Sequence, residues 1–170
     1  MDVVAHLDGL WRYARVLTRD DAAAEELVQE ALSRALALAR TFDLSRPLLP
    51  WLIAIVRNTY LTNISREKAE QRRIQSLGAI SNAASLPAQE YSTDLAQVQR
   101  AMETLPTEQA EVLHLVGVVG FSYADAADVL GIPQGTVMSR LSRARSALRQ
   151  ALEPKNSRTG LRVVGGRNDI

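Results

Sequence analysis

The stretch that decides the fold runs from Ser122 to Leu152 and reads "SYADAADVLGIPQGTVMSRLSRARSALRQAL". Ser122, followed three residues later by Asp125, is typical of a helix start, because each side chain can bond a free backbone N–H of the first turn. Gly131 can adopt the left-handed conformation that ends a helix, and Pro133 suits the start of the next. The stretch therefore predicts two helices joined by a short turn, which is the helix-turn-helix arrangement.

The second of these helices, expected over Gln134 to Leu152, has sides of different chemistry. Its apolar positions recur at steps of three and four and predict one buried stripe, formed by Val137, Leu141, Ala144 and Leu148. Polar and cationic residues occupy the rest: Thr136, Ser139, Arg140 and Arg143 opposite the stripe, and Met138, Ser142, Arg145 and Arg149 on one flank. Arginine is also favoured near any helix C-terminus, so a solvated basic surface is the alternative. Four arginines from 140 to 149 without an acid favour a helix that reads DNA in the major groove.

The rest of the chain also has helical periodicity, so we expect an all-α protein. A first helix is predicted within Val3 to Leu17 and a second after Asp20 or Asp21. The second helix has a predicted apolar stripe of Leu27, Ala31, Leu32, Ala35 and Leu38.

A third helix is predicted to start near Trp51, with Pro50 in its first turn, where no N–H is needed. Its first half is apolar and its second half charged. We therefore expect it to leave the core between Asn63 and Arg66.

Composition divides this helical chain into two small domains. Residues 76–92 are small, polar and nearly uncharged, which predicts a flexible linker between a domain at 1–75 and one at 93–153. Further helices are expected at about 93–103, 107–118 and 122–130. Glu103 and Glu108 there are interpreted as solvated helix charges. The tail at 154–170 has little apolar surface and is predicted to be mobile.

Bulk composition narrows the class of protein. The 170 residues carry a net charge of +1 and no cysteine, which excludes a disulfide scaffold, a thiolate zinc site and a cysteine nucleophile. No signal peptide or membrane span is expected, so the cytoplasm is the predicted location. The two histidines, His6 and His114, lack metal-ligand spacing, and no phosphate loop or nucleophile elbow is present. We expect neither an enzyme nor a cofactor or metal site, and interpret His114 as a core or subunit-surface residue.

Three motifs in register give a family resemblance over residues 8–152. "SYADAADVLGIPQGTVMSRLSRARSALR", preceded by "LPTEQAEVLHL", resembles the promoter-binding domain of extracytoplasmic-function sigma factors, the group IV members of the sigma-70 family. "AAAEELVQEALSRAL" and "WLIAIVRNTYL" resemble that family's other domain. The resemblance implies a transcription initiation factor that binds core RNA polymerase and recognises the −10 and −35 promoter elements.

The resemblance also implies which residues meet each partner. The β′ coiled coil of core polymerase would be bound through Glu26, Leu27, Gln29 and Glu30, although the acids of this helix could simply complement its N-terminus. At −10, a flipped base and the phosphates would be met by Trp51, Arg57, Asn58, Tyr60, Thr62 and Arg66, with Lys68, Arg72 and Arg73 further along. Trp51 alone would be taken for a core residue, whereas Arg57 and Asn58 interrupt an apolar helix and are harder to explain as core.

At the −35 element the resemblance places Met138, Ser139, Ser142 and Arg143 at base edges and Gly135, Thr136, Arg140 and Arg145 at phosphates. Position 138 is often Lys or Arg in the family, so Met138 predicts apolar contact with a thymine methyl instead. The loop "FDLSRPLLP" lacks the family's frequent Phe or Tyr just before the Trp. That absence leaves the captured −10 base open.

Two other classes of function compete with a sigma factor. An operator-binding helix-turn-helix regulator would explain the C-terminal domain but not the helix that contains Trp51 and the Arg57–Asn58 pair. An enzyme is disfavoured by the lack of catalytic motifs. The resemblance further implies an anti-sigma factor that covers the polymerase-binding and DNA-binding surfaces.

Overall fold

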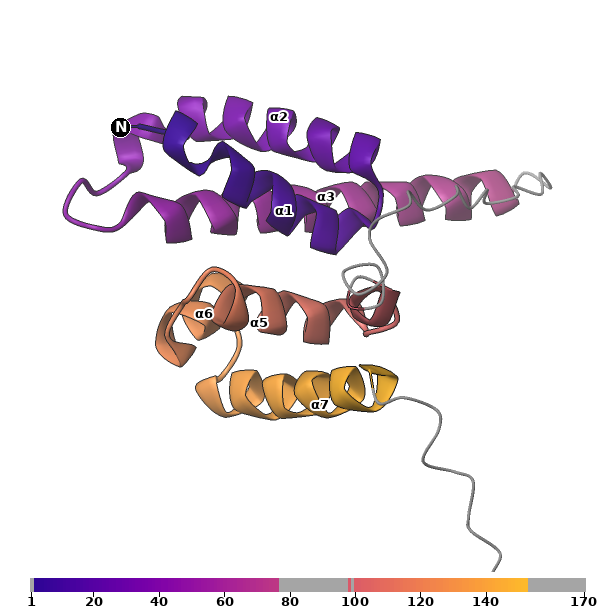
Figure 1. Ribbon diagram of the computed structural model, residues 1–170. Coiled ribbons are helices and arrows are strands. Elements are labelled where there is room, and N and C mark those ends of the chain that lie inside the picture. Colours follow the sequence, from indigo (N-terminus) through magenta and orange to yellow (C-terminus); the bar gives the residue numbers. More distant parts are fainter. Residues whose placement is uncertain (1, 77–97, 99, 153–170) are drawn as a thin grey trace, which may run out of the picture.

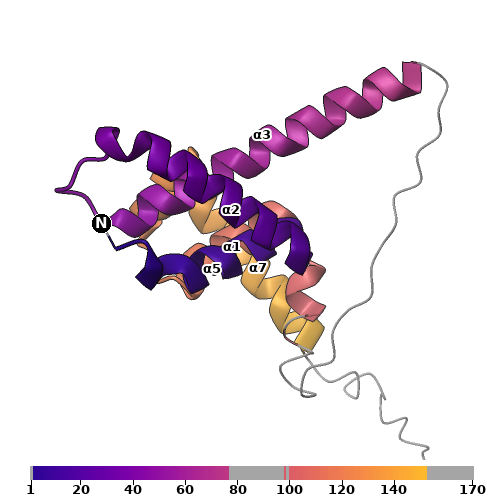
Figure 2. The same ribbon diagram turned by 90° about the horizontal axis from the view of Figure 1, so that it is seen from above.

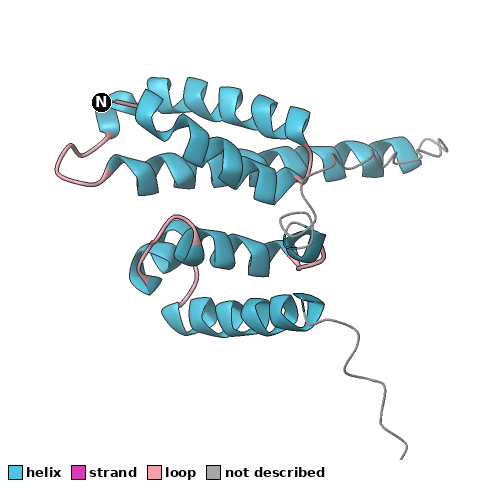
Figure 3. Ribbon diagram, viewed as in Figure 1, coloured by secondary structure: helices cyan, strands magenta, loops and turns pink. Residues whose placement is uncertain are grey.

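A computed structural model describes residues 2–76, 98 and 100–152, and every regular element within these ranges is helical (Figures 1 and 3). The predicted all-α class is thereby confirmed. A short 3-10 turn, Val4–His6, precedes the first helix. The main helices are α1 (Leu7–Thr18), α2 (Asp21–Leu38), α3 (Leu48–Ser76), α5 (Thr107–Gly117), α6 (Tyr123–Leu130) and α7 (Gln134–Leu152).

The N-terminal half begins with a hairpin of α1 and α2. Arg19 ends α1 in the left-handed conformation, with a φ of 59°. Asp20 then caps α2, because its carboxylate accepts a hydrogen bond from the N–H of Ala23 at 2.8 Å. A single residue in a left-handed conformation thus reverses the chain and lets α2 pack back along α1.

The buried side of α2 differs at one end from the predicted stripe. Leu27, Ala31 and Ala35 are buried and Leu32 packs partly against the core, as expected, with Ala24 and Val28 completing the buried side. The prediction for Leu38 was wrong, since 45% of its surface is exposed. This leucine is the last residue of α2, and a 3-10 turn, Ala39–Thr41, follows it.

Helix α3 begins at Leu48, earlier than the predicted start near Trp51, because Leu48 and Leu49 already pack against the core. Pro50 nevertheless lies in the first turn. Residues 65–73 of the helix are all exposed, so the prediction that it leaves the core between Asn63 and Arg66 is confirmed. Its second half extends away from the other helices (Figure 2). Ser76 ends α3, whereas residues 77–92 of the predicted linker and the predicted tail lie outside the described residues.

The helix-turn-helix forms as the sequence predicts. Ser122 and Asp125 make a reciprocal capping box at the start of α6. Gly131 ends that helix with a φ of 63°, where a side chain would be strained. Pro133 then accepts the first backbone bond of α7, from Thr136 at 2.8 Å. The angle between α6 and α7 is therefore set by local chemistry.

The two halves of the chain pack against each other. Helices α1 to α3 form one layer and α5 to α7 a second (Figure 1). α1 lies against α5, and α3 lies against α6. Buried residues of both layers, such as Leu10 and Ile53 in the first and Val112 and Leu115 in the second, belong to one continuous apolar cluster. The sequence predicts two separate domains and does not predict this shared core.

Candidate nucleic-acid interface

Helix α7 is anchored by the apolar stripe that its period predicts. Val137, Leu141 and Ala144 are essentially buried and pack against the other helices of the C-terminal half. Leu148 is only half-buried, because it lies in the last turns of α7, where less of the domain covers the helix. The stripe fixes the rotation of α7 about its axis, and this rotation determines which side chains face outward.

The outward side of α7 holds the residues predicted to meet DNA. Exposed among them are Gly135, Met138, Ser139, Ser142, Arg143 and Arg145, whereas Thr136 and Arg140 are half-buried. Within the described residues, no ion pair joins any of the four arginines of α7 to a carboxylate. These guanidiniums are therefore available to acceptors on another molecule.

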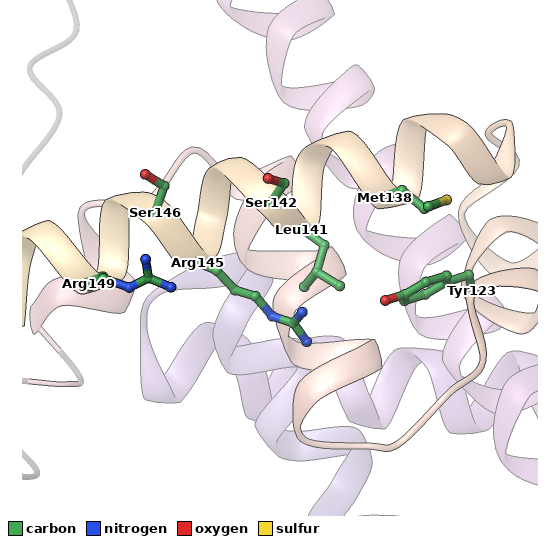
Figure 4. A pocket seen from close by; sticks show the side chains of 7 residues that line it. All are labelled: Tyr123, Met138, Leu141, Ser142, Arg145, Ser146 and Arg149. Carbon is green, nitrogen blue, oxygen red and sulfur yellow. The ribbon is translucent and has the colours of Figure 1, made fainter.

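An open groove of about 450 Å³ follows one flank of α7 (Figure 4). Tyr123 of α6 faces α7 from the other side of this groove, near Met138 and Leu141, and the Arg145 side chain extends toward the same side. Seven residues line it: Tyr123, Met138, Leu141, Ser142, Arg145, Ser146 and Arg149. The groove thus combines apolar, hydroxyl and cationic groups, which suits contact with a base edge and its phosphate.

The predicted −10 residues on α3 are in more varied environments. Trp51 is half-buried, and its ring packs on Phe42 with the ring centroids 4.8 Å apart. Phe42 lies well before Trp51 in sequence, but it places an aromatic ring beside the tryptophan where the loop has none in the preceding position. Asn58 and Arg66 are exposed. A base could therefore approach this end of α3, although part of the Trp51 ring already has a neighbour.

Two further α3 residues face the core or their own helix. Thr62 is half-buried, and its hydroxyl donates to the backbone carbonyl of Asn58 at 2.8 Å. Tyr60 is also half-buried, and its pKa is raised mainly by that burial and secondly by the nearby carboxylate of Glu111. Both are less accessible than Asn58, so they would contribute to binding only at the edge of a contact.

Arg57 is engaged within the protein. Its Nε donates to a carboxylate oxygen of Glu111 at 3.1 Å, and 17% of its side chain is exposed. Tyr13 of α1 donates to the same carboxylate oxygen at 2.9 Å. Burial is the main cause that raises the pKa of Tyr13, followed by the charge of Glu111. In this arrangement Arg57 contacts the C-terminal domain and presents little surface to a nucleic acid.

The four predicted polymerase-binding residues on α2 differ in exposure: two are exposed, one is half-buried and one is buried. Glu26 and Gln29 are exposed, whereas Leu27 is 4% exposed and belongs to the core. Glu30 is half-buried and accepts hydrogen bonds from Asn63 at 2.7 Å and Arg34 at 2.6 Å. The Asn63 bond is the main cause that lowers the pKa of Glu30. Leu27 therefore holds the helix in place, and Glu26 and Gln29 form its outward surface.

The sequence did not single out Glu111 or Tyr13 as members of a charged contact, and Glu103 has a partner that its sequence position did not indicate. Glu111 stands in the apolar run "EVLHLV", and its carboxylate is buried with 6% of its side chain exposed. The available signal was an acid at a position that helical spacing places on the same face as Leu115, four residues on. Glu103 is not merely solvated, since it pairs with Arg15 at 3.4 Å.

His114 is buried, as expected for a core residue. Its ring lies 6.0 Å from that of Tyr13, and burial lowers its pKa to about 4. Within the described ranges, no group of three or more His, Asp or Glu residues is placed to hold a metal ion. None of the helices in the described part of the chain has the length and apolarity needed to cross a membrane.

Comparison with known proteins identifies both halves of the chain. Residues 3–70 match the family described as Sigma-70 region 2, and residues 95–148 match Sigma-70, region 4. The chain is 36% identical over 147 residues to the ECF RNA polymerase sigma factor EcfG of Rhodopseudomonas palustris, covering 86% of this chain and 81% of that protein. It is 35% identical over 157 residues to the ECF sigma factor SigM of Mycobacterium tuberculosis, covering 92% and 78%.

Solved structures agree with this result. The sigma factor RpoE of Bartonella quintana, in complex with the anti-sigma factor NepR, has a TM-score of 0.73 and 34% identity, covering 91% of this chain and 96% of that one. CnrH, in complex with the cytosolic domain of CnrY, has a TM-score of 0.61 and 29% identity, covering 88% and 84%. The two helical domains and these relatives together show that the chain belongs to the ECF family of RNA polymerase sigma factors, which direct promoter-specific transcription initiation.

Proposed function

We propose that the two domains divide promoter recognition between them. In this proposal, residues 1–75 bind core polymerase and the −10 element, and residues 93–153 bind the −35 element. The observation that carries it is the outward side of α7, whose arginines lack carboxylate partners in the described structure while the opposite stripe is buried. The factor would act in the cytoplasm, where core polymerase and promoter DNA are found.

At the −35 element, α7 would lie in the major groove. Met138, Ser139, Ser142 and Arg143 would face base edges, with Gly135, Thr136, Arg140 and Arg145 at or near phosphates. The exposure of Met138, at 53%, and its place beside the groove formed with Tyr123 support an apolar contact with a thymine methyl. The N-terminus of α7, a helix of 19 residues, adds free N–H groups suited to a phosphate.

At the −10 element, exposed Asn58 and Arg66 and the edge of Trp51 would contact the separated strand. Tyr60 and Thr62 would contribute at the margin, and Arg57 would join once it is released from Glu111. Lys68, Arg72 and Arg73, on the extended part of α3, would follow the phosphates. RpoE of Bartonella quintana forms a complex with the anti-sigma factor NepR, which supports a similar partner for this chain.

The experiment that tests this function is run-off transcription with purified core polymerase on a genomic promoter library. We expect promoter-specific transcripts only when the chain is added. Reversing the charge of exposed Glu26 on α2, by Glu26→Lys, should abolish both transcript formation and co-elution with core polymerase. Glu25→Lys is the matched control, because Glu25 is also exposed on α2 but lies outside the proposed contact. A chain that never forms a complex with core polymerase would refute the proposal.

A further inference from the structure

The face shared by the two domains contains a charged centre. Glu111 of α5 is 4% exposed and lies among apolar neighbours, including Val112 and Leu115 of its own helix. Both groups that satisfy its carboxylate come from the other domain: the Tyr13 hydroxyl at 2.9 Å and the Arg57 Nε at 3.1 Å. A buried carboxylate is costly unless it is paired, so in the docked state Glu111 depends on Tyr13 and Arg57.

Two weaker polar contacts between the domains lie outside the Glu111 centre. Arg15 of α1 pairs with Glu103 at 3.4 Å, with both side chains partly exposed, and a guanidinium nitrogen of Arg19 donates to the backbone carbonyl of Leu105. Beside them is a cavity of about 190 Å³, lined mainly by apolar surface and by Arg15, Val16, Arg19, Met102, Glu103 and Ala110. This margin is thus partly solvated and loosely packed, whereas the contact around Glu111 is buried. Solvated ion pairs contribute little, so the specificity of docking resides at Glu111.

A second consideration is the distance between the two promoter elements. Elements at −10 and −35 are about 25 base pairs apart, or about 85 Å along straight duplex at 3.4 Å per pair. Even α3, the longest helix at 29 residues, spans only about 43 Å. The docked domains therefore cannot engage both elements at once, and the face that contains Glu111 has to separate on a promoter.

From these observations we propose that Glu111 is an internal latch, which holds the free factor closed and occupies Arg57 with a carboxylate in place of DNA. The latch itself concerns only the free chain. That it masks Arg57 from DNA rests on the −10 role proposed above. Opening the chain exchanges the Glu111 carboxylate for a phosphate as the partner of Arg57, so that the same guanidinium serves both states. Glu111 itself then becomes solvated, at little cost to either domain.

The latch is tested by measuring the distance between the domains in the full chain. The absence of native cysteine allows two labels, at Ser33→Cys on α2 and Ser146→Cys on α7, both exposed positions. In the free protein we expect one short, narrow distance distribution. Glu111→Gln should raise the population of long distances roughly tenfold or more, because Arg57 would then be buried without a counter-charge. Glu108→Gln makes the same chemical change at an exposed site of α5 and should leave the distribution unaltered.

Exchanging the two charges of the Glu111–Arg57 pair distinguishes domain opening from unfolding of the variant. Glu111→Arg combined with Arg57→Glu should restore the short distance that Glu111→Arg alone disrupts, with helical content unchanged by circular dichroism. Long distances in the unmodified chain, an unaltered distribution in Glu111→Gln, or no rescue by the exchange would each overturn the latch.

Binding of a single-stranded −10 oligonucleotide separates the two proposals. If Arg57 is masked, Glu111→Gln should bind the oligonucleotide several-fold more tightly than the unmodified chain does. The charge-exchanged chain should not, because it has a carboxylate at position 57. Equal binding by Glu111→Gln and the unmodified chain would overturn the masking of Arg57. Failure of every chain to bind, with the distances changing as expected, would instead overturn the −10 role and leave the latch supported.

Discussion

Arg143 on α7 and Arg57 on α3 are both arginines that the sequence singles out for DNA, yet they lie in opposite environments. Arg143 is exposed and has no carboxylate partner among the described residues, whereas Arg57 is held in an ion pair with Glu111 and is 17% exposed. The C-terminal surface is therefore ready to bind as it stands. The N-terminal surface is partly occupied by the protein itself. A motif can therefore be complete in sequence while one of its side chains is engaged elsewhere in the fold.

The outward orientation of the α7 arginines depends on the buried stripe beneath them. Truncating a residue of that stripe should therefore have the largest effect on stability. Leu141→Ala removes a side chain that is 2% exposed, which should cost about 2 to 5 kcal/mol of the free energy of unfolding. The measurement is urea unfolding followed by circular dichroism. The adjacent exposed change Ser142→Ala should stay within about 0.5 kcal/mol. Similar losses for both would contradict the rotation of α7 described above.

Removing the exposed arginine Arg143 of α7 should have the next largest effect. Arg143→Ala should cost about 1 to 3 kcal/mol of binding to a preferred −35 duplex and should relax preference at one or two base pairs. Arg145→Ala changes another exposed arginine of the same helix and should weaken binding to all sequences alike and reduce the salt dependence. Fluorescence anisotropy at two salt concentrations distinguishes these outcomes. An equal loss on every sequence for Arg143→Ala would show that it contacts phosphate only.

The docked face also predicts a dependence on pH. His114 is buried beside Tyr13, and its pKa falls from an ordinary 6.5 to about 4, so the unfolded chain binds the proton more readily. Stability from neutral His114 is therefore present above pH 6.5 and is lost as pH falls toward 4. We expect a loss of about 2 kcal/mol between pH 7 and pH 5.

Thermal or urea unfolding across pH 7 to 5 measures this loss, and His114→Gln should flatten it, since the amide does not titrate. The lowered pKa of Glu30 acts in the same direction but below its ordinary value of 4.5, outside this window. A slope that His114→Gln leaves unchanged would assign the effect to other groups.

Local chemistry explains why much of the fold was predictable. The capping box at Ser122, the left-handed Gly131 and the three-and-four spacing of Val137, Leu141 and Ala144 act within one or two turns, so the sequence reports them directly. The exposed side of α7 follows, because it is the complement of the buried stripe.

What could not be predicted depends on contacts between residues far apart in the chain. Arg57 and Glu111 are 54 positions apart, and Tyr13 and Glu111 are 98 apart, so periodicity carries no information about their meeting. Leu27 is a different case: the resemblance implied a polymerase contact, but its place in the apolar stripe already predicted the burial that the structure shows.

The location of Trp51, which packs on Phe42, has a practical consequence for fluorescence spectroscopy. The chain has two tryptophans, Trp11 and Trp51, and both belong to the N-terminal domain. Intrinsic tryptophan emission therefore originates in that domain alone. Trp51 lies at the end of α3 proposed for the −10 strand, so its emission can report binding of that half of the promoter. Helix α7 contains no tryptophan and contributes nothing to this emission.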